Sequence, residues 1–90
     1  MAVSSGAVTV GETAVALNEE SGATAGTRLY LYNGDAENGV SLGDADVTAG
    51  TGFVLGAGQS VALELTYGEV VYAVRVGDAD VDLQVMRTGV

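Results

Sequence analysis

The chain of 90 residues contains no cysteine, no histidine, no proline and no lysine. Without cysteine and histidine it cannot form a disulfide, and it lacks the usual side-chain ligands of zinc and haem iron. Histidine is also the most frequent general base, cysteine supplies the thiol nucleophile, and lysine forms Schiff bases. We therefore predict that the protein is not an enzyme and has no catalytic residue, no cofactor and no metal site.

Positive charge is also scarce, since three arginines stand against twelve acidic residues and the formal net charge is −9. Binding to a phosphate backbone or to an anionic membrane surface needs Lys and Arg side chains. No stretch has the length of a transmembrane helix, and the N-terminus lacks the charged-then-apolar plan of a signal peptide. We expect neither nucleic acid nor a membrane as a partner.

Glycine is abundant, and fourteen glycines separate short apolar segments. Many of these segments alternate apolar and polar residues, which indicates half-buried strands. In TRLYLYN the leucines share one face, and Arg28, Tyr30 and Tyr32 share the other. Segment 11–20 has some helix-favouring residues, but its alternation and flanking glycines favour a strand. The predicted strands lie within 7–11, 13–18, 27–33, 38–43, 52–56, 60–68, 69–76 and 80–86.

Turn-forming residues recur every eight to twelve positions, roughly the rhythm of a sandwich or small barrel. We predict an all-β fold, an antiparallel β-sandwich of about seven or eight short strands, with a jelly roll as one arrangement. Residues 1–90 form a single domain, and 1–6 are an extended N-terminal arm. The longest connection is 19–26. The nearly continuous apolar segment 69–76 is expected to be a central strand covered on both faces.

The pentapeptide GDADV occurs at 43–47 and at 77–81. In both copies an apolar segment ends before it and a valine follows the acidic residues. We interpret both copies as hairpin turns in which Gly supplies an unusual backbone angle, Asp caps local amides and Val starts the next strand. The flanking residues differ, so the repeat does not indicate a duplicated module.

Asp78, Asp80 and Asp82 have the first acidic spacings of a calcium loop. Such a loop also needs Gly at its sixth position and Glu at its twelfth. The chain has Leu83 and Gly89 there. A row of solvated carboxylates is the favoured interpretation, and weak binding of a cation is the alternative.

The tyrosines are the more informative candidates. Tyr and Arg are enriched at protein interfaces because each combines apolar area with a polar tip. Arg28, Tyr30, Tyr32 and Tyr72 are the candidate interface residues. In the alternative interpretation the rings only cover the outer face of a sheet, with their hydroxyls in water. Each arginine is expected to meet a carboxylate within or between subunits.

Three parts of the chain carry a resemblance to a known family. Residues 40–58 read VSLGDADVTAGTGFVLGAG, residues 70–74 form an apolar run, and residues 83–90 end in Gly-Val. With the preceding TRLYLYNGDAENGV, this pattern resembles a group of small structural proteins encoded among the head genes of tailed bacteriophages. It covers about two thirds of the chain. The positions that carry the resemblance are mostly turn glycines and alternating apolar residues.

The resemblance implies a virion structural protein, a capsid decoration protein on the outer surface of the head. Its partner would be the major capsid protein, and it would fold in the host cytoplasm. The acidic composition suits the outside of a shell better than a lumen filled with DNA. The small size suits a homo-oligomer, a trimer or pentamer. The alternatives are a carbohydrate-binding or host-attachment module of a tail or fibre, and a module of a bacterial surface layer.

Overall fold

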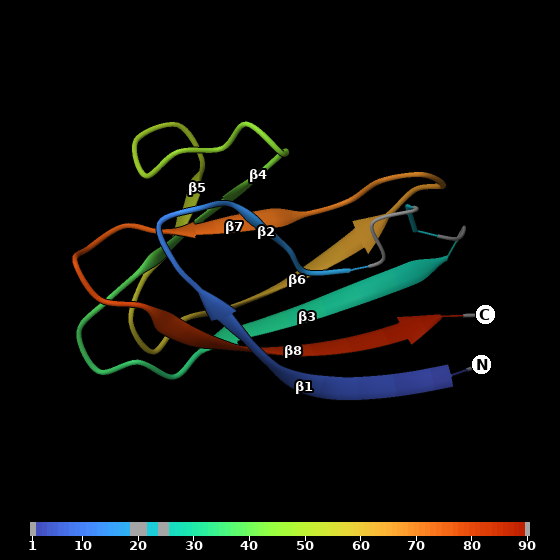
Figure 1. The fold of residues 1–90 in the computed structure, drawn as a ribbon. Coiled ribbons are helices and arrows are strands. Elements are labelled where there is room, and N and C mark those ends of the chain that lie inside the picture. The colour runs from blue at the N-terminus through green and yellow to red at the C-terminus, as the bar shows by residue number, and fades with distance from the viewer. Residues whose placement is uncertain (1, 19–21, 24–25, 90) are drawn as a thin grey trace.

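A computed structural model describes residues 2–18, 22–23 and 26–89. These residues form two antiparallel four-stranded sheets, and none of them belongs to a helix that could cross a membrane (Figure 1). Sheet A has the order β1-β8-β3-β6 and sheet B the order β2-β7-β4-β5. The strands are β1 (Ala2–Val10), β2 (Val15–Ala16), β3 (Thr27–Asn33), β4 (Val40–Gly43), β5 (Phe53–Leu55), β6 (Ser60–Leu65), β7 (Tyr72–Arg75) and β8 (Val81–Gly89). The predicted all-β sandwich is confirmed.

The strand order is that of a jelly roll. Strand β1 pairs with β8, β2 with β7, β3 with β6 and β4 with β5, so the pairs are nested inside one another along the chain. This is the pattern of one long hairpin with its closed end at β4 and β5. The two further pairings, β3 with β8 and β4 with β7, roll that hairpin into two layers.

The core lies between the sheets and is built by the period-two alternation of the strands. In β3 the burial alternates from Thr27 to Asn33, with Leu29 and Leu31 almost fully buried. The opposing core side chains come from both sheets and two connections: Val10, Leu17, Ala23, Val40, Leu42, Leu55, Leu65, Ala73, Val81 and Leu83. Since Leu29 and Leu31 face inward, the alternating side chains Arg28, Tyr30 and Tyr32 face outward.

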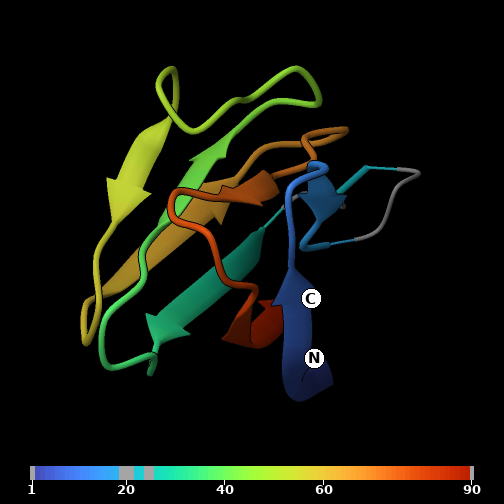
Figure 2. The ribbon, with the colours of Figure 1, turned by 60° about the vertical axis from the view of Figure 1, so that its left-hand side comes forward.

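Strand β7 is central in sheet B, as the sequence predicted, and both of its faces are covered. Ala73 belongs to the core, and Val74, on the opposite face, is also buried. The connection 44–52 provides that outer cover, because its Val47 is buried and Gly52 lies against Ser41. It forms the yellow-green loop beyond β4 and β5 in Figure 2.

The N-terminal residues are part of the sheet. We expected residues 1–6 to be an arm, but residues 2–6 belong to β1 and pair in register with 85–89 of β8. The predicted strand at 7–11 therefore extends to Ala2. The longest predicted connection, 19–26, lies mostly outside the described residues.

The two GDADV copies fold differently, so the prediction of two equivalent hairpins was wrong. Neither Gly43 nor Gly77 has a positive φ. A Cβ atom at Gly43 would lie 2.9 Å from Val47 Cγ2 and 3.1 Å from Val47 Cβ, so this glycine makes room for Val47, whereas one at Gly77 would meet only the end of the Asn38 side chain, at 2.9 Å from Oδ1. In the first copy the Asp44 carboxylate does cap the amide of Asp46.

The two connections also differ in where they lead. The first joins β4 to β5 within sheet B, and its valine is buried in the loop nearly as deeply as a core residue. The second carries the chain from β7 in sheet B to β8 in sheet A, and its valine starts β8. The same pentapeptide therefore occurs in a long hairpin loop and in a connection from one sheet to the other.

One buried amide ties three segments together. The Asn33 side chain, at the end of β3, donates to the carbonyl oxygens of Asn38 at 2.8 Å and Leu55 at 3.2 Å. Its oxygen accepts from the backbone N–H of Asp35 at 3.0 Å. A buried amide with all these partners satisfied fixes the end of sheet A against β5 of sheet B.

Candidate protein interface

The outward side chains of sheet A form one continuous surface, which we call the tyrosine face. The strand registers align its residues in rows across all four strands. One row runs Ser5, Met86, Tyr30 and Ala62, and the next runs Ala7, Gln84, Tyr32 and Ser60. Each row carries a tyrosine at its centre and small side chains on the two edge strands.

Neither of these rows contains a charged residue. Charges appear only beyond them, where Arg28 and Glu64 form an ion pair at one end and Asp82 accepts a hydrogen bond from Thr9 at the other. The chain as a whole carries −9. The acidic residues therefore lie around this surface and not on its centre.

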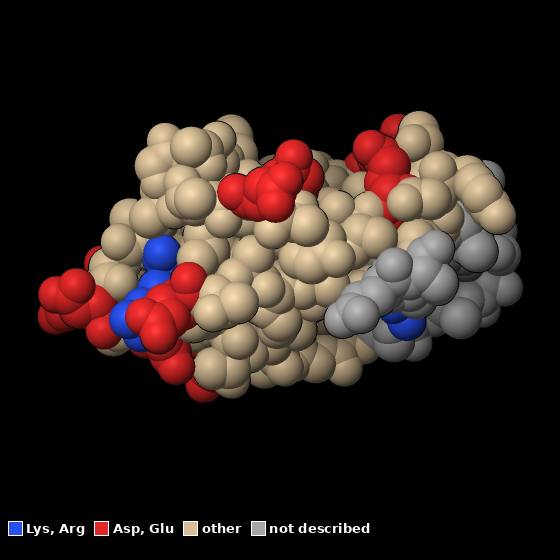
Figure 3. Space-filling model, turned by 45° about the horizontal axis from the view of Figure 1, so that its top comes forward, with Lys and Arg blue, Asp and Glu red and all other residues tan. Residues whose placement is uncertain are grey.

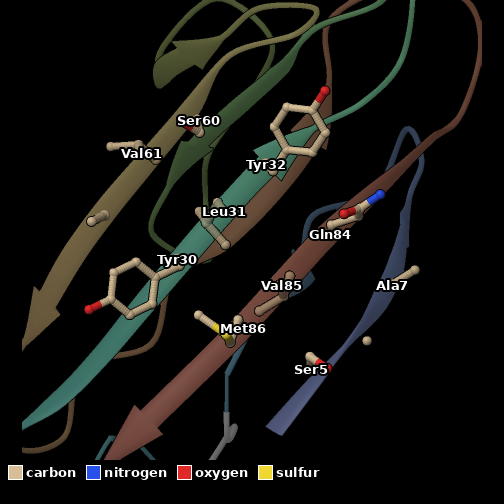
Figure 4. A pocket seen from close by; sticks show the side chains of 12 residues that line it. Ser5, Ala7, Tyr30, Leu31, Tyr32, Ser60, Val61, Gln84, Val85 and Met86 are labelled. Carbon is tan, nitrogen blue, oxygen red and sulfur yellow. The ribbon is translucent and has the colours of Figure 1, made fainter. Parts of the chain in front are cut away.

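The centre of the tyrosine face is hollowed. The hollow has a volume of about 750 Å³ and is lined by both rows together with residues 6, 31, 61 and 85. In Figure 4 Tyr30 and Tyr32 stand at its two ends along β3, with Met86 and Gln84 beside them on β8. In the two rows the side chains on β1 and β6 are small, and the large side chains of the face stand on β3 and β8.

Tyr32 and Met86 are exposed, at 44% and 39% of their full accessible area. A Cβ atom at Gly34 would lie 3.1 Å from the Tyr32 ring, so the ring rests directly over that glycine. Large apolar side chains exposed together on one face are typical of contact surfaces. The tyrosines, Met86 and the absence of charged residues from the two rows are features found at the centre of protein interfaces.

Arg28 closes one end of the face through two interactions. Its Nη2 lies 2.9 Å from Glu64 Oε1 on β6. A hydrogen bond with the Tyr30 side chain, followed by the charge of Glu64, raises the pKa of the guanidinium above its ordinary value. Since this ion pair is exposed, its role is to orient Arg28 beside Tyr30, with little effect on stability.

The four predicted interface residues do not form one surface. Arg28, Tyr30 and Tyr32 lie together on the outer face of sheet A, as their alternation indicated. Tyr72 lies in β7 of sheet B, where the neighbouring Ala73 faces the core, so Tyr72 is on the outer face of the opposite layer. The sequence could not place it, because both layers alternate in the same way.

Sequence reasoning missed the contribution of β8 and the edge strands. In the predicted strand 80–86 Gln84 and Met86 have the same parity, so the alternation was enough to place Met86 on the outward face. Ser5 was hidden by the interpretation of 1–6 as an arm, and Ala7 lay in the predicted strand 7–11, whose partner strand the sequence did not indicate. Phe53 and Tyr67 are exposed at 64% and 82% but lie outside the two rows.

The acidic residues of the second GDADV copy meet a cation from the chain itself. Arg75 Nη1 lies 2.6 Å from Asp80 Oδ1, and its Nη2 lies 3.7 Å from Glu12 Oε2. Figure 3 shows basic and acidic atoms side by side at this end of the molecule. Arg28 and Arg75 thus meet carboxylates within the chain, as predicted. Within the described ranges, Asp and Glu side chains form no group of three suited to hold a metal ion.

No family model, no curated protein and no solved structure matches the chain.

Proposed function

We propose that the protein is a virion structural protein that decorates the outer surface of a tailed-phage head. Its tyrosine face binds the major capsid protein, and a homo-oligomer reinforces the shell. The observation that carries this proposal is the pair of uncharged rows across sheet A in a chain of net charge −9. The resemblance in residues 40–58, 70–74 and 83–90 is the reason for proposing the major capsid protein as the partner.

An uncharged, tyrosine-bearing surface is suited to burial against another protein. Burying a carboxylate without a partner costs several kcal/mol, so an acidic protein needs a contact surface from which carboxylates are absent. Tyr and Met residues add apolar area, at roughly 25 cal/mol per Å² buried. The acidic remainder of the molecule keeps unassembled copies soluble and repels nucleic acid.

Reinforcement follows from mass action. A protein that binds the assembled shell but not its separated subunits stabilises the shell by an amount set by its concentration and affinity. Many copies in a lattice add their contributions, so each contact can be weak. The jelly roll supports a structural role, because this fold is common in viral capsid domains, although a fold alone does not determine function.

Co-sedimentation with shells assembled without this protein tests the proposal. The protein should pellet with the shells and saturate at a fixed number of copies per capsid subunit. Because the contact is uncharged, raising the salt concentration from about 0.05 to 0.5 M should change the affinity little. Absence of the protein from the pellet at saturating concentration would overturn the decoration role.

A carbohydrate-binding or host-attachment module is the second candidate. The hollow between Tyr30 and Tyr32 is edged by Gln84, Ser5 and Ser60, which offer amide and hydroxyl groups to a sugar. Aromatic rings are common platforms for sugar rings, and jelly rolls also occur in lectins. Glycan binding that is lost in Tyr30→Ala and Tyr32→Ala, with no binding to shells, would favour this candidate.

A further inference from the structure

The two sheets have four edge strands, and three of them offer little to another chain. In sheet B, β2 has two residues and β5 has three. In sheet A, β6 has six residues and carries Glu64, paired with Arg28. Short strands and charged side chains are the usual means by which proteins prevent edge-to-edge pairing.

The fourth edge, β1, has none of these features. It has nine residues, contains no charged residue and no proline, and pairs with β8 in an unbroken register from Ala2–Gly89 to Val10–Val81. Figure 1 shows β1 at the margin of the sheet, outside β8. Among its described side chains Ser5, Ala7 and Thr9 are exposed, and Gly6 has no atom near its Cβ position. Half of its backbone N–H and C=O groups point away from β8.

We infer that β1 pairs antiparallel with β1 of a second copy about a two-fold axis. The centre of the strand is Gly6, and a register that places Gly6 opposite Gly6 sets Ser5 opposite Ala7. Outward residues then meet outward residues, and inward residues meet inward ones. Ser5, Gly6 and Ala7 at the centre of the contact are all small, so the two backbones can approach to the ordinary spacing of about 4.8 Å.

The charges favour a second copy as the occupant. Two copies of net charge −9 repel each other least where carboxylates are absent from the contact, and β1 is such a strip. The nearest carboxylate on the outer face is Asp82, beside Thr9. In the register centred on Gly6 the two Thr9 residues lie six positions apart, about 20 Å along the strand. That distance exceeds the Debye length of about 8 Å at physiological salt, so the mutual repulsion is screened.

The pairing joins two four-stranded sheets into one of eight strands. The tyrosine faces of both copies then lie on the same side and meet at β1, which borders the hollow of each. This inference adds to the proposed function the contact between copies. It rests on the proposed function only in assigning the two joined tyrosine faces to shell binding. An isologous contact closes after two copies, so the expected unit is a dimer and not the trimer or pentamer expected from size.

Sedimentation equilibrium of the free protein tests the pairing. Wild type should be dimeric at concentrations of tens of micromolar. Gly6→Asp places like charges directly opposite each other and should weaken the dimer by about tenfold or more. Gly6→Ser at the same position and Ala62→Asp on the other edge of sheet A should remain dimeric. A wild type that is monomeric up to about 1 mM, or equal weakening by Gly6→Asp and Ala62→Asp, would overturn the inference.

Cysteine cross-linking tests the register, because the chain has no cysteine of its own. Cβ atoms of directly opposed residues in antiparallel strands lie about 4.5–5.5 Å apart, close to the reach of a disulfide. Gly6→Cys should therefore form a covalent dimer on mild oxidation, and Ala62→Cys should not. Equal cross-linking of both variants would contradict the pairing. Neither experiment uses shells, so a dimer that fails to bind shells would overturn only the proposed function.

Discussion

At the scale of single residues, the position of a side chain in its strand decides whether it supports the core or the surface. Alternation alone placed Arg28, Tyr30 and Tyr32 outward, and the same parity would have added Met86. Alternation could not indicate that Asn33 is fully buried. That depends on carbonyl oxygens from residues 38 and 55, which become neighbours only after the sheets assemble.

Replacing Asn33 by Ala should lower the free energy of unfolding by about 2–4 kcal/mol. The substitution removes three hydrogen bonds and leaves the carbonyl oxygens of Asn38 and Leu55 without this donor, at a cost of about 1 kcal/mol or more each. Urea unfolding followed by circular dichroism measures the change. Gln84→Ala, an exposed amide on the tyrosine face, is the control and should change stability by less than about 0.5 kcal/mol. Similar values for both variants would contradict the role assigned to Asn33.

Glu69 should make stability depend on pH in the acid range. The backbone N–H of Thr66, followed by its hydroxyl, holds the pKa of Glu69 below its ordinary value, with Thr66 N at 2.5 Å from Oε1. The folded state thus binds the proton less readily than the unfolded state. The stabilisation is fully present above the unfolded-state pKa, near 4.3, and is lost as pH falls through the folded-state pKa.

The measurement is the difference in melting temperature between wild type and Glu69→Ala as a function of pH. The difference should be largest near neutral pH and should shrink as the solution is acidified below about pH 4. Taking the difference removes the effect of the other carboxylates, which titrate in both proteins. A difference that grows on acidification would contradict the assignment.

At the scale of elements, the sequence located the strands that the structure describes but, apart from the hairpin of β4 and β5, not which strands pair. Periodicity reports which face of a strand is buried, and both sheets bury one face in the same way. Tyr72 was therefore grouped with Tyr30 and Tyr32 although it lies in the other sheet. Local turn chemistry was similarly insufficient for GDADV, because one copy lies in a connection within sheet B and the other in a connection from sheet B to sheet A.

The connection 44–52 provides a matched pair of glycine substitutions. A Cβ atom at Gly52 would overlap Ser41 Oγ and lie 2.5 Å from the carbonyl oxygen of Leu42, whereas one at Gly50 would have no atom within 4 Å. Gly52→Ala should destabilise the protein by about 1–3 kcal/mol, as overpacking does. Gly50→Ala should change stability by no more than about 0.5 kcal/mol. Thermal unfolding compares the two, and equal effects would show that the loop does not pack on β4.

At the scale of the whole molecule, the nested pairing of the jelly roll brings together the two ends of the chain. Composition and turn spacing were enough to predict an all-β sandwich, because a chain with fourteen glycines and period-two segments has few other ways to bury its apolar residues. The nesting itself follows from long-range pairing, which no local pattern encodes. The N-terminal segment was taken for an arm because its partner, β8, is at the opposite end of the chain.

Folding kinetics should reflect this topology and the absence of proline. Long-range pairings are slow to form, so refolding should take milliseconds to seconds. With no X-Pro bond, refolding should lack the phase of tens of seconds that prolyl isomerisation produces. Double-jump stopped-flow experiments test this, because the refolding amplitudes should not depend on the time spent unfolded. A slow phase accelerated by a prolyl isomerase would contradict the expectation.

The proposed contact between the uncharged rows of sheet A and the shell can be tested by comparing two tyrosine-to-aspartate variants in shell binding. Tyr32→Asp introduces a carboxylate into those rows, and Tyr67→Asp introduces one at an exposed tyrosine outside them. Once both variants are shown to melt like wild type, each is titrated against undecorated shells and the pelleted fraction is measured. We predict that Tyr67→Asp binds like wild type and that Tyr32→Asp binds at least about tenfold more weakly. Equal binding by the two variants would rule out the tyrosine face as the surface that contacts the shell.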